Sequence, residues 1–259
     1  MDFGIAGRVA LVTGASGGLG FGVAKAPSAE GARVGICSRD RDRIKRAAID
    51  VGPERRAFVA DFHDAVSRTS LVALVEEALG SIEILVINSG GPSAGRFEIP
   101  DDDRWADVVD QHVLAAATLL RTVLPSMRAR RWGRIVMVTS CSVKQPSNQM
   151  ILSNTSRAAL VGLARSLANE VASDDMSVNN IMPGYTRTPW LVQLSEQISK
   201  LDGRPPEAIV AEWEREIPMR RLGRVEEFAN TVAFLCSERA SYVTRVSLSV
   251  DGGWNRSLF

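Results

Sequence analysis

Residues 9–20 read Val-Ala-Leu-Val-Thr-Gly-Ala-Ser-Gly-Gly-Leu-Gly, and a segment rich in alanine and valine follows from Phe21. The apolar start predicts a short strand, the glycines predict a tight turn, and the following segment predicts a helix. Glycine lets the backbone approach a bulky anion, and the free N–H groups of a new helix attract negative charge. The unit therefore predicts a diphosphate site. Because Gly14, Gly18 and Gly20 do not have G-x-G-x-x-G spacing, a purely structural turn is the alternative.

Composition and charge indicate one globular domain. The chain has 259 residues, 45% of them hydrophobic, with 31 Lys and Arg against 30 Asp and Glu. This length suits a single α/β domain over residues 1–259, and the balanced charge predicts no nucleic-acid or membrane partner. Because the first residues lack a long apolar core and no apolar run reaches membrane-spanning length, we expect a soluble, cytoplasmic protein.

Cysteines and histidines are too few and too scattered to predict a metal site. The three cysteines are Cys37, Cys141 and Cys236, and the two histidines are His63 and His112. An odd number of cysteines in unrelated surroundings fits a reducing compartment, and we expect each to be a small buried side chain. We expect no bound metal.

Predicted strands and helices alternate along the chain. The strands cover residues 33–37, 57–60, 84–87, 134–139, 178–181 and 246–250, and the helices cover 40–50, 65–79, 101–130, 154–171 and 225–237. Such alternation predicts a parallel sheet with helices on both faces, because right-handed crossovers place them there. Ligands then bind at the carboxyl ends of the strands. Pro27 is expected to kink or shorten the first helix.

Four motifs follow one another along nearly the whole chain. They are Thr13-Gly14-x-x-x-Gly18-x-Gly20, Asp61 at a strand end, Asn88-Ser89-Gly90, and Pro183-Gly184-x-x-x-Thr188. In order and spacing they resemble the short-chain dehydrogenase/reductase family, in particular its 3-oxoacyl-carrier-protein reductase-like branch. The resemblance implies a Rossmann-type, doubly wound α/β sheet of about seven strands that binds a nicotinamide dinucleotide.

The resemblance also implies where the dinucleotide is held. The glycine turn would hold the diphosphate, Asp61 would reach the adenine, and the Asn88 segment would line the adenosine ribose. The loop from Pro183 to Thr188 would hold the nicotinamide. The expected cofactor-binding residues are Gly14, Ser16, Gly18, Leu19, Gly20, Ser38, Arg39, Asp61, Phe62, Asn88, Gly90, Arg157, Pro183, Gly184, Thr186 and Thr188.

The end of the second predicted strand indicates which dinucleotide is bound. An acid there would accept hydrogen bonds from the ribose 2′-hydroxyl, but the chain has Ser38-Arg39. A guanidinium beside a hydroxyl suits a 2′-phosphate, so we favour NADP(H) over NAD(H). The alternative is that Arg39 is one more solvated arginine, like Arg41, Arg43 and Arg46.

The catalytic positions depart from the family pattern. Relatives use a serine, a tyrosine and lysine in a Tyr-x-x-x-Lys pair, and an asparagine on the long helix. Ser140 matches the serine, whereas the tyrosine position is Ser153, the lysine position is Arg157 and the asparagine position is His112. We name these four as the candidate catalytic residues.

These replacements change the available proton chemistry. An aliphatic hydroxyl is a much poorer acid than a tyrosine beside a lysine, and arginine stays protonated. Ser153 and Arg157 are one helical turn apart, so Arg157 can hydrogen-bond a ribose or stabilise negative charge. His112 is the residue best suited by type to exchange a proton near neutral pH, and a structural histidine is the alternative.

Three functions are compatible with this site. The first is NADP(H)-dependent oxidation or reduction of a carbonyl or alcohol, such as a 3-oxoacyl compound, with a proton path through His112, Tyr185 or water. The second is reduction of an imine or iminium carbon, since a preformed iminium takes hydride without a proton. The third is a dinucleotide-binding protein with non-redox catalysis or none.

Three further segments bear on the substrate and on subunit partners. Residues 188–219 occupy the position of the family's substrate lid and mix apolar with charged side chains, although a helical pair packed on the body is the alternative. The polar loop of residues 141–152 should line the opposite wall and fits a small-molecule substrate with polar groups. The apolar stripe Val108, Val109, Val113, Ala116 and Leu120 serves as core or as the interface of a homodimer or homotetramer.

Overall fold

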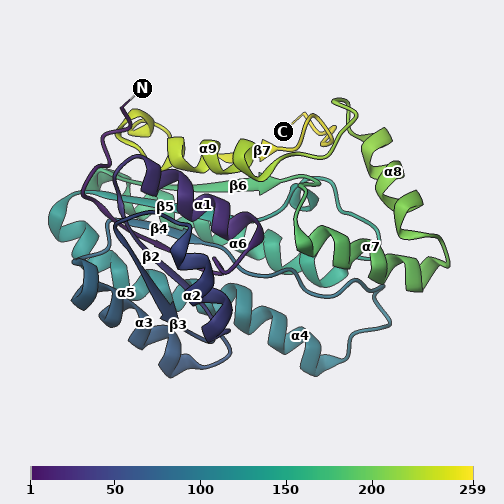
Figure 1. Cartoon of the computed structure of the whole chain (residues 1–259), viewed down its shortest axis with the longest axis horizontal. Helices are drawn as coiled ribbons and strands as arrows, with labels where there is room; N and C mark the ends of the chain where they lie inside the picture. Colours follow the sequence, from purple (N-terminus) through teal and green to yellow (C-terminus); the bar gives the residue numbers. More distant parts are fainter. Residues whose placement is uncertain (1, 259) are drawn as a thin grey trace.

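The computed structural model describes residues 2–258 and is built on one parallel sheet (Figure 1). Its strands are β1 Val9–Val12, β2 Arg33–Ser38, β3 Arg55–Val59, β4 Ile84–Ile87, β5 Gly133–Val138, β6 Met176–Pro183 and β7 Ser247–Val250. They pair in parallel in the order β3-β2-β1-β4-β5-β6-β7. The predicted Rossmann-type, doubly wound sheet of about seven strands is confirmed.

Helices cover both faces of this sheet. They are α1 Gly18–Ala29, α2 Arg41–Ile49, α3 Ala65–Leu79, α4 Asp102–Val109, α5 Ala115–Arg130, α6 Ile151–Val171, α7 Pro189–Asp202, α8 Pro206–Glu216 and α9 Val225–Leu235. The buried side chains of α1, α2 and α9 form one apolar cluster with the sheet, and those of α3, α5 and α6 form another. Pro27 lies in the last turn of α1, which ends two residues later at Ala29. The proline is thus tolerated where the helix stops.

The predicted long helix over residues 101–130 is interrupted in its middle. A π-helical segment, Asp110–Leu114, joins α4 to α5 and contains His112. Such segments are rare and occur frequently at functional sites. In the predicted apolar stripe, Val108 is buried but Val109, the last residue of α4, is 41% exposed.

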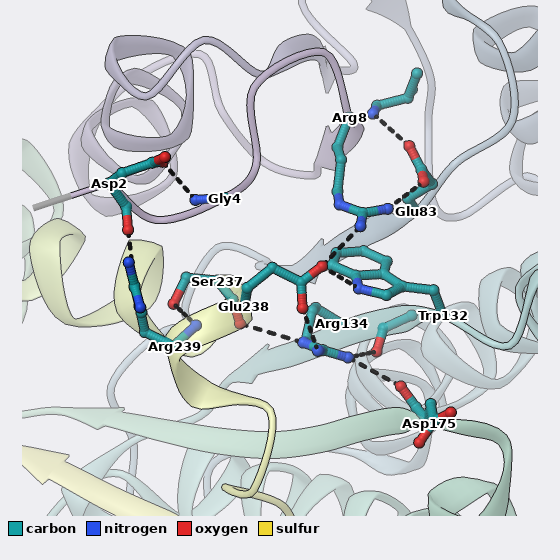
Figure 2. Close-up of polar contacts among 12 residues, drawn as sticks. Asp2, Gly4, Arg8, Glu83, Trp132, Arg134, Asp175, Ser237, Glu238 and Arg239 are labelled. Carbon is teal, nitrogen blue, oxygen red and sulfur yellow. Dashed lines mark hydrogen bonds and ion pairs between the residues drawn. The ribbon is translucent and has the colours of Figure 1, made fainter.

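A cluster of ion pairs and hydrogen bonds links residues at the amino ends of the strands (Figure 2). Arg8 bonds to Glu83 at 2.6 Å and to Glu238 at 2.7 Å, and Glu238 also accepts a bond from the Trp132 indole at 2.8 Å. The guanidinium groups of Arg8 and the buried Arg134 lie 3.6 and 4.5 Å from the centre of the Trp132 ring. Cations over an indole face are attracted to it, so this end of the sheet is closed and cross-linked.

The opposite end of the sheet is open for a ligand. Strands β2 and β3 lie on one side of β1, whereas β4 and the later strands lie on the other, so the connections diverge between β1 and β4. Ligands of open α/β sheets bind at such a point. Helices α7 and α8 lie beyond this end (Figure 1) and share an apolar cluster with Cys141, Met182 and Trp254. Within residues 2–258, none of the helices combines the length and the apolar character needed to cross a membrane.

Candidate active site

A cleft of about 1430 Å³ at the carboxyl ends of the strands brings the predicted site residues together. The predicted catalytic residues that line it are Ser140, Ser153, Arg157 and His112. The predicted cofactor-binding residues that line it are Gly14, Ser16, Gly18, Leu19, Gly20, Ser38, Arg39, Asp61, Phe62, Asn88, Gly90, Arg157, Pro183, Gly184, Thr186 and Thr188. Every residue predicted to be catalytic or cofactor-binding therefore lines the same cleft.

Three positions of the glycine turn, Gly14, Gly18 and Gly20, disfavour a side chain. Gly14 and Gly18 have positive φ angles of 59° and 57°. A Cβ atom on Gly20 would lie 2.3 Å from the Gly14 carbonyl oxygen. Asn88 braces the turn, because its Nδ2 donates to the Gly14 oxygen at 3.1 Å and its backbone N–H donates to Thr13 Oγ1 at 2.9 Å. The bare backbone and the start of α1 form a cradle that suits a diphosphate.

Two arginines without ion-pair partners among residues 2–258 flank the end of β2. Arg39 and Arg43 are both exposed and both line the cleft. Arg43 Nη2 lies 3.6 Å from where a Cβ on Gly17 would be, so this guanidinium reaches the glycine turn. Ser38 Oγ donates to the Asp40 carbonyl at 3.2 Å. The sequence indicated Arg43 only as a solvated arginine. Its position four residues after Arg39 was the feature that could have indicated a shared site.

His112 is buried and held by two hydrogen bonds. Its Nε2 lies 3.1 Å from the Gly90 carbonyl oxygen, and its Nδ1 lies 2.8 Å from Ser156 Oγ. A carbonyl can only accept, so Nε2 carries the proton of the neutral ring. Ser156 Oγ also lies 2.7 Å from the Leu152 carbonyl oxygen, so its one proton is shared between that oxygen and Nδ1. Burial, reinforced by the positive charge of Arg157, lowers the pKa of His112 to about 3. This pKa favours the alternative of a structural histidine over proton exchange by His112 near neutral pH.

Arg157 is buried and bonded to backbone carbonyls. Its Nη1 donates to Val138 at 2.9 Å, and its Nη2 donates to Ser89 at 3.0 Å and to Gly90 at 3.2 Å. Burial lowers the pKa of Arg157 to about 10, which leaves it protonated at pH 7. The guanidinium thus ties the end of β4 to the end of β5, and a ribose could be contacted only with its other N–H groups.

Two hydroxyl groups face the cleft near this brace. Ser140 Oγ accepts a bond from the Ser142 backbone N–H at 3.1 Å, so its own O–H is available as a donor. Ser153 is 6% exposed, and its Oγ has no hydrogen-bond partner within the described part of the chain. The pair can hold the oxygen atom of a substrate, but neither is a strong acid.

Aromatic side chains form the wall at the other end of the cleft. Tyr185 stacks on Trp213 with ring centres 4.7 Å apart and meets Trp254 edge-on at 5.5 Å. Burial raises the pKa of Tyr185, so this phenol is a weaker acid than a free tyrosine. Of the polar side chains expected on the facing loop, Gln145, Ser147, Asn148 and Gln149 line the cleft and Lys144 does not.

Helices α7 and α8, which cover most of the predicted lid of residues 188–219, line the cleft on one side. Gln197 of α7 accepts a bond from the Ala94 backbone N–H at 2.9 Å, which connects the lid to the segment after β4. The indole of Trp190 packs so closely on Gly91 that a Cβ there would lie 2.5 Å from the ring. Cys37, Cys141 and Cys236 are buried and unpaired, as expected. Over residues 2–258, no cluster of three or more His, Cys, Asp or Glu could hold a metal ion.

Comparisons with known proteins agree with this geometry. A family model described as enoyl-(acyl carrier protein) reductase matches residues 14–255. Oxidoreductase UcpA of Escherichia coli (strain K12) is 35% identical over 255 residues, which is 96% of this chain and 95% of UcpA. The chain therefore belongs to the short-chain dehydrogenase/reductase family, as predicted, and it is an oxidoreductase of that family.

Solved structures of two reductases are also similar. L-sorbose reductase from Gluconobacter frateurii, in complex with NADPH and L-sorbose, is 34% identical with a TM-score of 0.92 and full coverage of both chains. An actinorhodin polyketide ketoreductase variant with NADPH is 30% identical with a TM-score of 0.93, over 96% of this chain and 98% of that one.

Proposed function

We propose that this protein is an NADP(H)-dependent oxidoreductase acting on a carbonyl or alcohol carbon. The proposal depends chiefly on one observation: the glycine cradle and the hydroxyls of Ser140 and Ser153 open into the same cleft. NADP(H) supplies or accepts a hydride at its nicotinamide ring. The NADPH complexes of the two similar reductases support this choice of dinucleotide.

The residues of the cleft fit this cofactor. The close packing around Gly14 and Gly20 leaves bare backbone where a diphosphate would lie, and the start of α1 favours negative charge. Arg39 and Arg43 offer two guanidinium groups for a 2′-phosphate, which is planar bidentate recognition of the kind arginine makes best. The loop from Pro183 to Thr188 would hold the nicotinamide.

The hydroxyl groups act on the substrate directly, and His112 and Arg157 support them by positioning the neighbouring backbone. Ser140 and Ser153 donate hydrogen bonds to the oxygen of the substrate, which stabilises the charge that develops there. His112 and Arg157 fix the Ser89–Gly91 segment through the Gly90 carbonyl. With no side chain of suitable pKa at the tyrosine position, the proton is exchanged with water in the open cleft.

Reduction of an imine or iminium carbon is the second candidate, and one observation favours it. The pKa values of two titratable groups that line the cleft with Ser153, about 3 for His112 and about 10 for Arg157, both lie far from neutrality. A carbonyl reductase needs a general acid, whereas an iminium carbon takes hydride without one. The loss of tyrosine and lysine would then cost little activity.

Cofactor titration and a substrate panel test these proposals. Calorimetry should show NADPH binding more tightly than NADH. Oxidation of NADPH by 3-oxoacyl esters or simple ketones would support the first function, and oxidation by cyclic imines alone would support the second. Tight binding of NADPH with no turnover across the panel would instead indicate a dinucleotide-binding protein without redox catalysis, and no binding of either dinucleotide would overturn the proposal.

We also propose a homodimer or homotetramer. Val109 and Leu114, 41% and 51% exposed, are apolar side chains on the helix through which the family resemblance implies pairing. Burial of such side chains between identical subunits is favourable. Light scattering should give two or four times the mass of one chain, and the mass of a single chain would contradict the proposal.

A further inference from the structure

One carboxylate in the lid half of the cleft has no cation to neutralise it. Glu216, the last residue of α8, lines the cleft, and its Oε2 accepts a hydrogen bond from Trp254 Nε1 at 3.0 Å. That indole N–H is neutral. Across residues 2–258, no Lys, Arg or His side chain forms an ion pair with Glu216.

The other carboxylates of this half are already paired. Glu212 and Asp202 both bond to Arg204, and Asp202 also lies 4.0 Å from Arg96. Both arginines line the cleft, and both therefore have acidic partners of their own. Glu216 is thus left as the uncompensated negative charge of the wall.

One aromatic side chain contacts this carboxylate, and two more adjoin it. Trp254, which donates to Glu216, meets Tyr185 edge-on at 5.5 Å, and Tyr185 stacks on Trp213 at 4.7 Å. The faces of such rings carry negative charge density and attract cations, most strongly where water is displaced. A carboxylate beside a tryptophan- and tyrosine-lined wall is the combination that binds alkylated ammonium groups.

We propose that Glu216 and the wall of Tyr185, Trp213 and Trp254 bind a cationic nitrogen of the substrate. This inference rests on the proposed hydride transfer and narrows its substrate class to organic cations, such as alkylammonium or iminium compounds. The cation lies against the lid, and the reacting carbon faces Ser140 and Ser153. Neutral polyols, whose hydroxyls a carboxylate also binds, are the competing class.

Two probes of the same shape separate charge from size. Choline and 3,3-dimethylbutan-1-ol differ in having a quaternary nitrogen or a quaternary carbon, and sorbitol represents polyols. We expect calorimetry on the full chain, with and without saturating NADPH, to show choline binding about tenfold more tightly than the alcohol or sorbitol. Added salt should weaken choline binding and leave the alcohol unaffected.

Two variants on the same helix locate the charge. Glu216→Gln should abolish the preference for choline. Glu214→Gln, which removes a carboxylate that lies 3.9 Å from Arg187 and outside the cleft lining, should keep it. Because Glu216 is exposed at a helix end, its variant is expected to fold, and its melting temperature checks this.

The inference is overturned if the alcohol or sorbitol binds as tightly as choline, or if Glu216→Gln keeps the preference. Both results can be obtained whether or not NADPH binds. Absence of NADPH binding would remove the proposed function, while a choline preference in that protein would still establish the cation site. The two failures are thus separate.

Discussion

His112 Nε2 and Arg157 Nη2 converge on the carbonyl oxygen of Gly90, at 3.1 Å and 3.2 Å. The first residue lies in the π-helical segment and the second in α6, so one oxygen joins two helices to the end of β4. These are two of the positions where the sequence analysis predicts a departure from the family pattern. The replacement pair acts as a brace for the cleft floor, and neither member offers a proton with a pKa near neutrality.

Arg157→Lys should destabilise the protein, because a single ammonium group cannot reach the three carbonyl groups that the guanidinium bonds. We expect the free energy of unfolding to fall by about 1–3 kcal/mol in urea titrations. Arg165→Lys, on an exposed position of the same helix, should change it by less than about 0.5 kcal/mol. Equal stability of the two variants would show that the brace contributes nothing.

His112→Asn should change how stability depends on pH. The folded pKa of His112, about 3, lies below its ordinary value of 6.5, so between these values the unfolded chain binds more protons. Stability is therefore lost as pH falls from 6.5 toward 3. Urea unfolding at pH 7.5 and pH 5 should show a smaller difference for His112→Asn than for the unaltered chain. The same difference in both would mean that His112 titrates normally.

Gly20→Ala should prevent dinucleotide binding, because the new Cβ would lie 2.3 Å from the Gly14 oxygen and 2.6 Å from Asn88 Nδ2. We expect the dissociation constant for NADPH to rise by at least about tenfold and the melting temperature to fall. Gly17→Ala is the matched control, since its Cβ has only Arg43 Nη2 nearby, at 3.6 Å, and its φ of 171° is ordinary extended backbone. Unchanged binding by Gly20→Ala would argue against the cradle.

Arg39→Ala and Arg43→Ala should each weaken NADPH binding by about tenfold and leave NADH binding unchanged, because only NADPH carries the 2′-phosphate. Arg41 lies on the same helix as Arg43 but outside the cleft lining, so Arg41→Ala should weaken the binding of neither dinucleotide. Calorimetric titration of all three variants measures this. If NADH loses as much affinity as NADPH, the arginines contact another part of the dinucleotide.

The sheet was predictable where strands are short and fully apolar. β4 covers Ile84–Ile87, as predicted, because all four side chains are buried and no polar residue obscures its ends. β3 was predicted as residues 57–60 but spans Arg55–Val59, because this edge strand begins with two arginines, half-buried Arg55 and exposed Arg56, that are typical of a loop. Helix α6 begins at Ile151, three residues before the predicted start, since no capping side chain marks it.

The positions of the site residues were more predictable than their chemical state. The order of the motifs along the chain was sufficient to predict that the glycine turn, Ser153 and His112 lie in one cleft. The neutral state of His112 depends on burial and on the positive charge of Arg157, which outweigh the hydrogen bond to the Gly90 carbonyl, and only the folded chain brings these groups together. Glu216 likewise has no ion-pair partner because Arg204 and Arg96 pair with other carboxylates, an arrangement that only the folded chain shows.

Transfer of a label from the cofactor to a product tests the central claim most directly. NADPH carrying deuterium at its hydride-donating carbon should be incubated with the protein and a panel of ketones and cyclic imines, with Gly20→Ala as the inactive control. The account predicts a product containing one deuterium, found by mass spectrometry, with the unaltered chain only. Bound NADPH without deuterium in any product would contradict it.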